Sequence, residues 1–510
     1  MRNNYSLIIL LLAAIKLVLP FLLSHPAFEL HRDEYLYYEQ GQHLAFGYLE
    51  NPPMIGLLAF MSSLMGGSFF WVKFWPALFG SLTLLTTAGI VKELGGNLFA
   101  QVIASLGILL TAYLRIHFLL QPNFLDIFFW TLSAYFLLRF INTKREKYIY
   151  LLCFALVLGW WSKYSVLFFV AALFISILLT KHRNIFQNKN FWFGAGLGIL
   201  FILPNILWQY SHNWPLVLHM GELRDTQLKY INKGDFIKEQ LLMLLPVLFV
   251  WIGGLIWLLK NNKYRIIGLM YLSVVILLML GSGKGYYALG AYPMLLAAGG
   301  AWVERISVKR KWIRYAAVSL ILIFAIPFIP ILLPMQSPKN MAATNKKMRL
   351  EKLGLLKWED QKQHPLQQDF ADMLGWKQLA KKSENIFQQF PDSIKKNTIV
   401  YCRNYGQAGA LIYYGTRDLF KKKVISDNGT FLLWIPDELY FKHLLFIGRR
   451  MPEKDDEVFQ HFGKITIMDS INNPLSRQHG DKIIFFENGS DSVWQLAVSG
   501  LKEMKARFGQ

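Results

Sequence analysis

The chain has 510 residues, of which 54% are hydrophobic and 15% aromatic, and its mean hydropathy is positive. This composition is too apolar for an ordinary soluble enzyme and predicts repeated membrane spans. The formal net charge is +21, but lysine and arginine fall in short clusters between apolar runs, which argues against a nucleic-acid partner. Only Cys153 and Cys402 are present, so neither a disulfide framework nor a cysteine metal site is expected.

Apolar runs of spanning or near-spanning length predict about eleven membrane spans. They cover residues 7–24, 69–91, 97–113, 124–140, 148–161, 164–180, 191–208, 240–259, 265–281, 288–303 and 315–334. The first run is predicted to be a retained span rather than a signal peptide, because no small-x-small cleavage site precedes the following HRDE. The run 54–66 is shorter and ends in Gly-Gly-Ser, so we expect it to lie along the interface or to re-enter.

The charged connections predict the orientation of the spans. With a cytoplasmic N-terminus, the inside connections are 92–96, 141–147, 181–190, 260–264 and 304–314, and they hold KREK, KHR, KNNKYR and ERISVKRKWIR. This excess of cations follows the positive-inside rule and supports a cytoplasmic N-terminus. The outer side then carries the first outer loop 25–54 with HRDE, Arg115, Lys163, the loop 209–238 and Lys284.

The composition changes after residue 335, which divides the chain into a transmembrane domain, 1–335, and a second domain, 336–510. The second domain is rich in Lys, Gln and Asp, and it contains the strand-like pieces NTIVYC, FLLWI, KITIMD and KIIFFEN and the helix-like AGALIYYG. The predicted fold is therefore an α-helical polytopic membrane protein with a C-terminal soluble α/β domain. An odd number of spans places this domain on the periplasmic side, together with HRDE.

An acidic pair, Asp33 and Glu34, stands where the first apolar run ends. Alone it could be a solvated loop beside lipid headgroups, but ionisable residues also stand at other predicted outer span ends, where such groups are costly unless they pair or serve a site. They are Arg115 and His117 in YLRIHFLLQPNFLD, Lys163 in GWWSKYS and Lys284 in GSGKGYY. Such cations could hold the phosphate of a lipid that carries a group to be transferred, while a carboxylate activates the acceptor.

Lys284 and its neighbours have alternative interpretations. Lys284 could be an anchor that extends to the membrane surface, and Tyr286, Tyr287 and Tyr292 could form an aromatic belt. The surrounding GSGKG is not a nucleotide-binding loop, because that motif needs a glycine at the position of Leu278 and a Ser or Thr at the position of Gly285.

The stretch HRDEYLYYEQGQHLAFGYLENPP, residues 31–53, resembles the first outer loop of the multispanning GT-C glycosyltransferases that use polyprenyl-phosphate sugars. These are the bacterial relatives of dolichyl-phosphate-mannose protein mannosyltransferases and of lipid A aminoarabinose transferases. QPNFLD, GWWSKYS, GKGYYALGAYP, FADMLGW and YGQAGALIYYG resemble later segments of the same family. The resemblance implies Asp33 as the catalytic residue, with Glu34 beside it. The substrate-binding residues expected in these outer segments are Arg115, Gln121, Asp126, Lys163, Lys284, Tyr286 and Tyr287.

The sequence departs from the family where aminoarabinose transferases have Glu-Lys-Pro-Pro, because this chain has Glu50-Asn51-Pro52-Pro53 and lacks the phosphate-binding lysine there. Lys163, Arg115 or Lys284 would have to replace it. Glu50 and His219, in WPLVLHMGELRD, resemble the metal-binding pair of those relatives and are the candidate ligands of a divalent metal. The alternative for His219 is a hydrogen-bonded loop histidine.

These observations predict an inverting glycosyltransferase. It would move a hexose or pentose from a polyprenyl phosphate in the lipid bilayer to a protein, lipid or envelope-glycan acceptor on the periplasmic side, with Asp33 as general base. A transporter or flippase of a polyprenyl-linked glycan is the alternative, although no matched pair of interrupted helices is evident. A scaffold that binds cell-wall polymer is a third reading, which would leave the charges at the outer span ends unexplained.

Overall fold

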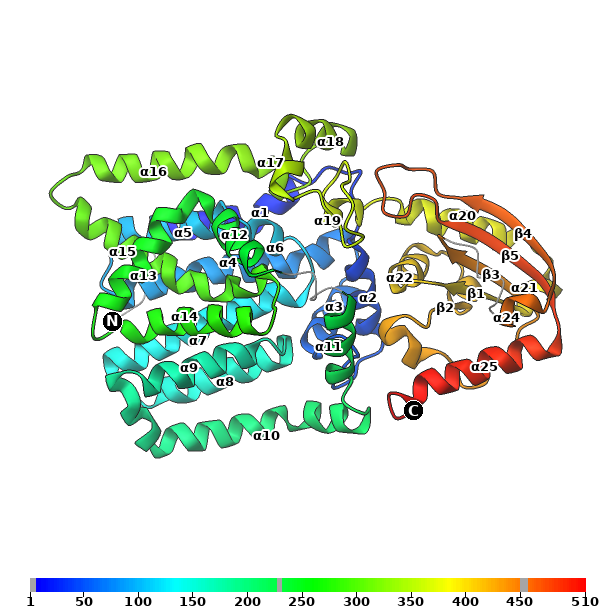
Figure 1. Ribbon diagram of the computed structural model, residues 1–510, viewed down its shortest axis with the longest axis horizontal. Helices are drawn as coiled ribbons and strands as arrows, with labels where there is room; N and C mark the ends of the chain where they lie inside the picture. Colours follow the sequence, from blue (N-terminus) through cyan, green and yellow to red (C-terminus); the bar gives the residue numbers. More distant parts are fainter. Residues whose placement is uncertain (1–5, 227–231, 450–456) are drawn as a thin grey trace.

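The computed structural model describes residues 6–226, 232–449 and 457–510; the other residues, which include 227–231 of the predicted outer loop 209–238, lie outside this description. The helices of the N-terminal part run side by side between two ends, and a small sheet with its own helices lies beyond one of these ends (Figure 1). The predicted domain boundary at residue 335 falls between α17, Ile329–Leu332, and α18, Pro338–Lys347.

Among the described residues, four helical segments are long and apolar enough to cross a membrane. They are α4 (Phe69–Glu93), α7 (Pro122–Thr143), α10 (Lys189–Ser211) and Trp312–Leu332, which comprises α16, η5 and α17. Two bent pairs raise the number to six if each is one span: Val166–Leu178 (α9) with Lys181–Gln187 (η1), and Lys233–Met243 (α12) with Leu245–Lys260 (η3 and α13). The shorter apolar helices are α1 (Leu7–Leu22), α3 (Met54–Leu64), α5 (Leu98–Leu109), α8 (Lys147–Ser162) and α14 (Arg265–Leu280). Eleven spans therefore stays a prediction.

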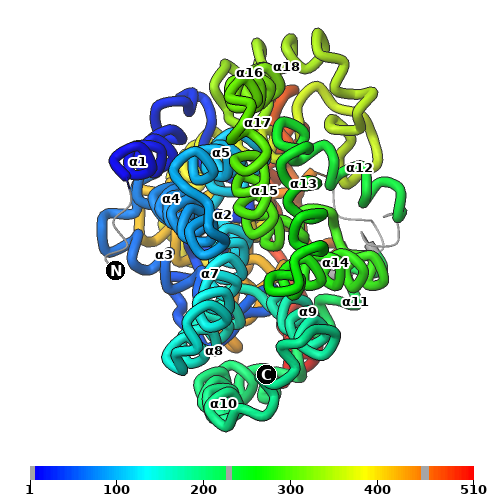
Figure 2. Tube along the Cα trace, turned by 90° about the vertical axis from the view of Figure 1, so that its left-hand side faces the viewer, coloured from blue at the N-terminus to red at the C-terminus, as the bar shows by residue number. Residues whose placement is uncertain are grey.

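Helices α10 and α16 lie at the periphery of the helical part, as Figure 2 shows from the end opposite the sheet. Only 22% of the apolar stretch is buried in α10 and in Trp312–Leu332, against 67% in α4 and 72% in α7. Large apolar side chains such as Phe201 and Ile323 are exposed along the two peripheral helices. A continuous apolar surface of this kind faces lipid rather than water. The chain is therefore a membrane protein.

The predicted inner connections meet at the end of the helices that lies opposite the sheet (Figure 1). Arg139 Nη1 donates to Glu93 Oε1 (2.7 Å), the Tyr264 hydroxyl donates to the Glu93 carbonyl (3.1 Å), and the Asn97 N–H donates to Glu304 Oε2 (2.7 Å). The first two bonds join the end of α4 to α7 and α14, and the third joins the start of α5 to α15 (Tyr292–Ser307). The cation-rich connections and HRDE therefore lie at opposite ends of the helices.

The run 54–66 forms the 11-residue helix α3, which packs against α2, Arg32–Gln42, at the end that faces the sheet. Eleven residues span about 16 Å, roughly half of a bilayer core, so α3 alone is too short to cross a membrane. The two helices meet closely at Gly41, where a Cβ atom would lie 2.5 Å from the backbone N of Phe60. Glycine at this position therefore lets α2 lie directly on α3.

The C-terminal part contains a five-stranded sheet in the order β2-β1-β3-β5-β4. The strands are β1 (Thr398–Cys402), β2 (Val424–Ile425), β3 (His443–Gly448), β4 (Phe462–Ser470) and β5 (Lys482–Gly489). β1 is parallel to β2 and β3, whereas β5 is antiparallel to both β3 and β4. NTIVYC, KITIMD and KIIFFEN are strands as predicted, and AGALIYYG lies in the helix α22, Tyr405–Tyr414.

The prediction of a strand for FLLWI is wrong, because these residues lie mostly in the 3-10 helix η7, Gly429–Trp434. Gly429 has a left-handed backbone (φ +64°), which starts this tight turn. Phe431, Leu432 and Ile435 are all buried, a helical spacing that alternating strand residues would not give.

Short helices complete the chain. They are α6 (Tyr113–Ile116), α11 (Pro215–Thr226), η4 (Gly285–Ala291), η6 (Leu350–Leu353), α19 (Gln368–Ala371), α20 (Trp376–Gln389), α21 (Asp392–Lys396), α23 (Asp418–Lys421), α24 (Glu457–Gln460) and α25 (Asp491–Ala506).

The two parts of the molecule share one hydrophobic core at their junction. Buried side chains from α2, α3 and α7 pack in the same cluster as side chains from α20, α22, β1 and β3. α2 and α22 lie against each other with Arg32 beside Gly406 and Tyr35 beside Gly409, so the two helices run in parallel. A Cβ atom on Gly409 would lie 2.9 Å from the Tyr35 carbonyl oxygen. This close contact fixes the C-terminal part directly over the first outer loop.

Candidate active site

HRDE forms the start of α2 and fixes the directions of its two carboxylates. His31 is the N-cap: its Nδ1 accepts from the Asp33 N–H (3.1 Å), and its own N–H donates to Glu34 Oε2 (2.7 Å). This capping box satisfies backbone donors at the helix start. Because successive residues of a helix point in directions about 100° apart, Asp33 and Glu34 enter different surroundings.

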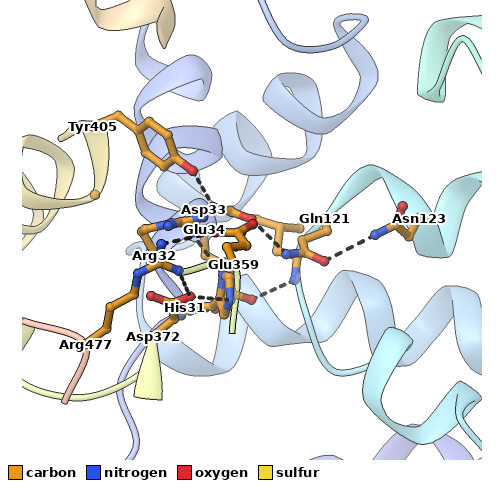
Figure 3. Close-up of polar contacts among 12 residues, drawn as sticks. His31, Arg32, Asp33, Glu34, Gln121, Asn123, Glu359, Asp372, Tyr405 and Arg477 are labelled. Carbon is orange, nitrogen blue, oxygen red and sulfur yellow. Dashed lines mark hydrogen bonds and ion pairs between the residues drawn. The ribbon is translucent and has the colours of Figure 1, made fainter. Parts of the chain in front are cut away.

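The Asp33 carboxylate lies at the junction of the two parts of the molecule (Figure 3). Its Oδ1 accepts from the Tyr405 hydroxyl (2.7 Å) and from Arg32 Nε (3.3 Å), and its Oδ2 accepts from Gln121 Nε2 (3.0 Å). Burial would raise the pKa of Asp33, but the charges of Arg32 and His31 and the hydrogen bonds from Tyr405 and Arg32 hold it well below its usual range. The side chain keeps 21% of its surface exposed. It is thus an ionised carboxylate in a fixed orientation that a substrate can still reach.

FADMLGW contributes to this geometry from the C-terminal part. The Arg32 N–H donates to the Asp372 carbonyl (3.0 Å), and the Asp372 carboxylate accepts from Arg477 Nη1 (3.0 Å). Arg477 Nη2 also donates to Glu359 Oε2 (3.1 Å). Figure 3 shows Arg477 and Asp372 on the side of Asp33 away from Asn123. These contacts hold the first turn of α2 in place. The carboxylates of Asp372, Asp33 and Glu359 all attract the Arg32 guanidinium.

A line of polar side chains runs from Asp33 along the ends of α7 and α8 that face the sheet. Gln121, which bonds to Asp33, accepts at its Oε1 from Asn123 Nδ2 (3.2 Å), and Asn123 Oδ1 accepts from Lys163 Nζ (2.6 Å). Lys163 Nζ also lies 4.1 Å from the ring centre of Tyr287. The sequence predicted Gln121, Lys163 and Tyr287 as site residues, and the structure brings them to one continuous surface.

Lys284, Tyr286 and Asp126 lie around the same end of this line. Lys163 Nζ is 5.6 Å from the ring centre of Tyr286, and the charges of Lys284 and Asp126 both act on Lys163. Asp126 is buried, and its Oδ2 accepts from the Ser165 hydroxyl (2.8 Å). Lys163 and Lys284 are neighbouring cations, with Asp126 near Lys163 and Glu239 near Lys284. Two cations this close together can bind an anionic group between them.

Glu34 does not share the site of Asp33. Both of its oxygens accept from Lys73 Nζ (2.7 and 2.5 Å), and its Oε1 also accepts from the Leu120 N–H (2.6 Å). The side chains of Glu34 and Lys73 have no exposed surface. With every oxygen occupied and no access for a substrate, this arrangement gives no support to the predicted catalytic role of Glu34. Instead, Glu34 ties α2 to α4 and to the segment before α7.

Arg115 is also engaged elsewhere. Its Nη1 donates to Asp369 Oδ2 (3.3 Å), its Nη2 donates to the Ile331 carbonyl, and its guanidinium lies 4.4 Å from the ring centre of Phe370. These partners belong to α17 and α19 and their surroundings, so Arg115 holds the connection between the two parts. The geometry does not favour it as a phosphate ligand.

Glu50 and His219 show no metal-site geometry. Glu50 accepts from the Thr430 N–H (2.7 Å), from the Thr430 hydroxyl and from Gln40 Nε2 (3.3 Å), so both oxygens already have donors. His219 lies on α11, where burial and the charge of Lys284 both lower its pKa. Within the described ranges, no three His, Cys, Asp or Glu residues gather as metal ligands would. The residues present therefore do not fit a bound divalent metal, and no step below uses one.

Solved structures share the overall fold of this chain. ArnT from Cupriavidus metallidurans, solved with bound undecaprenyl phosphate, matches with a TM-score of 0.63 at 11% sequence identity, over 94% of this chain and 97% of that chain. This chain has a GT-C glycosyltransferase fold. The apo state of the same ArnT gives a TM-score of 0.57 at 12% identity, with coverage of 94% and 97%. The apo oligosaccharyltransferase from Archaeoglobus fulgidus gives 0.50 at 11% identity, over 90% of this chain and 70% of that chain.

Sequence comparison adds a match to one part of the chain. Residues 50–208 match the family described as dolichyl-phosphate-mannose-protein mannosyltransferase. A search of curated proteins finds no match. The matched segment begins at Glu50 and contains Gln121, Asp126 and Lys163. The GT-C resemblance predicted from short motifs is thus confirmed for the fold and, within residues 50–208, for the sequence.

Asn51 stands at the position where the sequence departs from the Glu-Lys-Pro-Pro pattern. Asn51 and Gln40 exchange two side-chain hydrogen bonds (3.1 Å each), and both side chains are buried. Asn51 therefore stabilises the first outer loop and lies outside any phosphate site.

Sequence analysis missed three residues of the candidate site. Arg32 and Tyr405 bond to Asp33, and Lys73 holds the neighbouring Glu34. Arg32 stands within HRDE and was overlooked beside the acidic pair. Lys73 is a cation inside the apolar FFWVKFWPALFG, which is a signal that a buried partner must exist. Tyr405 begins YGQAGALIYYG, but nothing in the sequence indicates that it meets a residue 372 positions away.

Proposed function

We propose that this protein transfers a sugar from a polyprenyl phosphate to an acceptor hydroxyl, with Asp33 as the general base. The observation that carries the proposal is the environment of Asp33, an accessible carboxylate oriented by Tyr405, Gln121 and Arg32 at the outer ends of apolar helices. The polar line to Lys163 supports a reaction in which a base and a phosphate-binding cation act on one bound donor.

The comparisons and the charges of the site together support a polyprenyl-phosphate donor. The matched family is named for dolichyl-phosphate-mannose, and the ArnT structure contains undecaprenyl phosphate. In this chain, Lys163 and Lys284 stand where helices α8 and α14 end. A prenyl chain could lie along the apolar helices while its phosphate reaches these lysines.

The reaction is proposed to be a single displacement. The acceptor oxygen bonds to the anomeric carbon as the bond from that carbon to the phosphate oxygen breaks, and the acceptor proton passes to Asp33. Polyprenyl phosphate leaves on the opposite face, which inverts the configuration. Because the pKa of Asp33 is held low, this carboxylate is a weak base. Much of the acceleration must then come from orientation and from stabilising the leaving phosphate through Lys163 and Lys284.

Donor binding should weaken in mildly alkaline solution. Burial and the nearby charge of Lys284 lower the pKa of Lys163 to about 8, against the attraction of Asp126. Lys163 is cationic below this value and loses its charge as the pH rises through it. We expect the dissociation constant of the polyprenyl-phosphate sugar to rise between pH 7 and pH 9 in the wild type. Lys163→Arg, which stays charged, should show a flat profile; equal profiles would remove Lys163 from the phosphate site.

The substitution Lys284→Met should weaken donor binding at least tenfold, which corresponds to about 1.4 kcal/mol. Methionine keeps much of the length of the side chain but removes the charge that faces the phosphate. Binding of the donor in detergent measures the effect, with expression and melting temperature as controls. A membrane anchor would give the opposite result, namely unchanged donor affinity with reduced insertion or stability.

The protein is proposed to lie in a bacterial inner membrane with its C-terminal part in the periplasm. A periplasm-dependent reporter fused after residue 340 should be active, and a cytoplasm-dependent reporter fused within 141–147 should be active. The reverse pattern would place HRDE in the cytoplasm and would contradict the proposed donor geometry.

Deletion of the gene offers the direct test of the function. Mass spectrometry of the deletion strain should show an accumulated polyprenyl-phosphate sugar and an envelope glycan, lipid or protein that lacks this sugar. The purified protein should then restore the sugar in vitro. If the purified protein cannot transfer the accumulated sugar, and only its passage across the membrane is lost, the chain is a transporter.

A further inference from the structure

Two adjoining cavities lie at the seam between α2 and the C-terminal part. Their volumes are about 420 Å³ and about 290 Å³, and both are lined by Glu39, Ile412 and Lys421. The larger cavity extends to Tyr38, Tyr413 and the Gly66–Ser68 turn before α4, while the smaller extends to Trp434 and Phe431. Together they have the size of a small-molecule site. Neither cavity is lined by Asp33.

We call the two cavities together the seam groove. The groove is lined by residues of the parallel helices α2 and α22. Asp33 and Tyr405 mark the first turns of this pair, whereas Glu39 and Ile412 mark its last turns. Six residues of α2 separate Asp33 from Glu39, which is about 9 Å along the helix axis. The groove is therefore a second site close to the first, on the same helix.

Glu39 is a buried acidic residue of the groove, and no described residue donates a hydrogen bond to its carboxyl group. Its side chain is 8% exposed, and its recorded contact with a described side chain is His43 Nδ1 at 3.7 Å, beyond hydrogen-bonding distance. Burial raises the pKa of Glu39 to about 7, against the attraction of Lys421. A buried carboxylate without donors costs free energy that a ligand with hydroxyl groups would recover.

The groove also has an aromatic wall. The His43 and Trp434 rings are stacked, with their centres 4.4 Å apart and their planes at 16°, and Phe431 packs against Trp434 at 4.9 Å. On the other side of Glu39, the rings of Tyr38 and Tyr413 meet edge to face at 5.1 Å. Flat rings beside a hydrogen-bond acceptor suit a ligand with an apolar face and a polar edge.

The groove holds groups of both signs, because Glu39 and Lys421 line both cavities and Lys422 lines the smaller one. A ligand with a charge of either sign meets a like charge here as well as an opposite one. A neutral ligand with several hydroxyl groups can donate to Glu39, accept from the lysines and stack on the aromatic wall. A neutral sugar has all three properties.

We propose that the seam groove binds a neutral sugar unit of the acceptor glycan. This inference rests on the proposed function, because it assigns the groove to the substrate whose hydroxyl group reaches Asp33. It narrows the acceptor class from protein, lipid or glycan to a molecule that carries a neutral saccharide.

A glycan array measures this binding directly. The full chain in lipid nanodiscs is applied to an array of neutral, anionic and amino oligosaccharides, and the affinity for the best ligand is then measured by calorimetry. We expect a neutral oligosaccharide to bind, with at least tenfold weaker binding for Glu39→Gln and for His43→Ala. Glu438→Gln is the matched control, since Glu438 is exposed on the C-terminal part outside the groove.

The outcomes separate this inference from the proposed function. Asp33→Asn should lose transfer but keep neutral-sugar binding, because Asp33 does not line the groove. If the protein transfers sugar but binds no neutral glycan, or binds an anionic or amino glycan more tightly, the groove assignment is wrong. Glycan binding that survives both groove substitutions would also overturn it. Binding that depends on Glu39 in a protein without transferase activity would support the groove and contradict the proposed function.

Discussion

Replacing Asp33 by asparagine is expected to leave the protein folded and to slow sugar transfer by roughly 10²–10⁴-fold, the usual contribution of a general base. Asparagine keeps the size of the side chain, and its carbonyl oxygen can still accept from Tyr405 at the position of Oδ1. It cannot take the acceptor proton. Its amide nitrogen would also face Gln121 Nε2, so Gln121 would have to turn its amide.

The measurement is a single-turnover transfer rate with purified protein, together with a melting temperature. Asp437→Asn is the matched control, because Asp437 is an exposed carboxylate that pairs with Lys505 far from the site. Tyr405→Phe should retain the base but lose one orienting donor, so its rate should lie between those of the wild type and Asp33→Asn. Transfer by Asp33→Asn at nearly the wild-type rate would make Asp33 an ordinary loop carboxylate.

The parts of the fold that were predictable from sequence are those governed by local rules. Apolar runs indicated the helices, and cation clusters indicated which connections share one end. Short motifs also indicated Asp33, Gln121 and Lys163, which the structure brings together. These signals lie within a few residues of one another, so one sequence is enough to read them.

Other features depend on contacts between distant segments and could not be predicted. FLLWI has strand-like composition, but Thr430 donates to Glu50 and the turn at Gly429 shapes the segment as a 3-10 helix. The same contact occupies Glu50, which the sequence alone offered as a metal ligand. In both cases the partner lies 380 residues away, and tertiary context overrides the local preference.

The two neighbouring carboxylates of HRDE illustrate this limit most clearly. Sequence analysis treated Asp33 and Glu34 as one acidic pair, because charge and position are the same for both. The helix directs them apart, so that Asp33 meets hydrogen-bond donors at an accessible surface and Glu34 meets Lys73 in the interior. Burial therefore distinguishes a group that can exchange a proton with substrate from one that holds the loop.

Substitution of Lys73 by methionine is expected to lower the free energy of unfolding by about 3–5 kcal/mol, the usual cost of removing one partner from a buried ion pair. Glu34 would remain as a buried anion, with only the N–H groups of His31 and Leu120 as donors. Thermal unfolding in detergent measures the loss. The double substitution Lys73→Met with Glu34→Leu should recover part of it, because no buried charge is then left unpaired. Lys144→Met, at an exposed connection, is the control and should change little. A Lys73→Met protein that melts at the wild-type temperature would show that this pair does not hold α2 in place, and the orientation of Asp33 would need another cause.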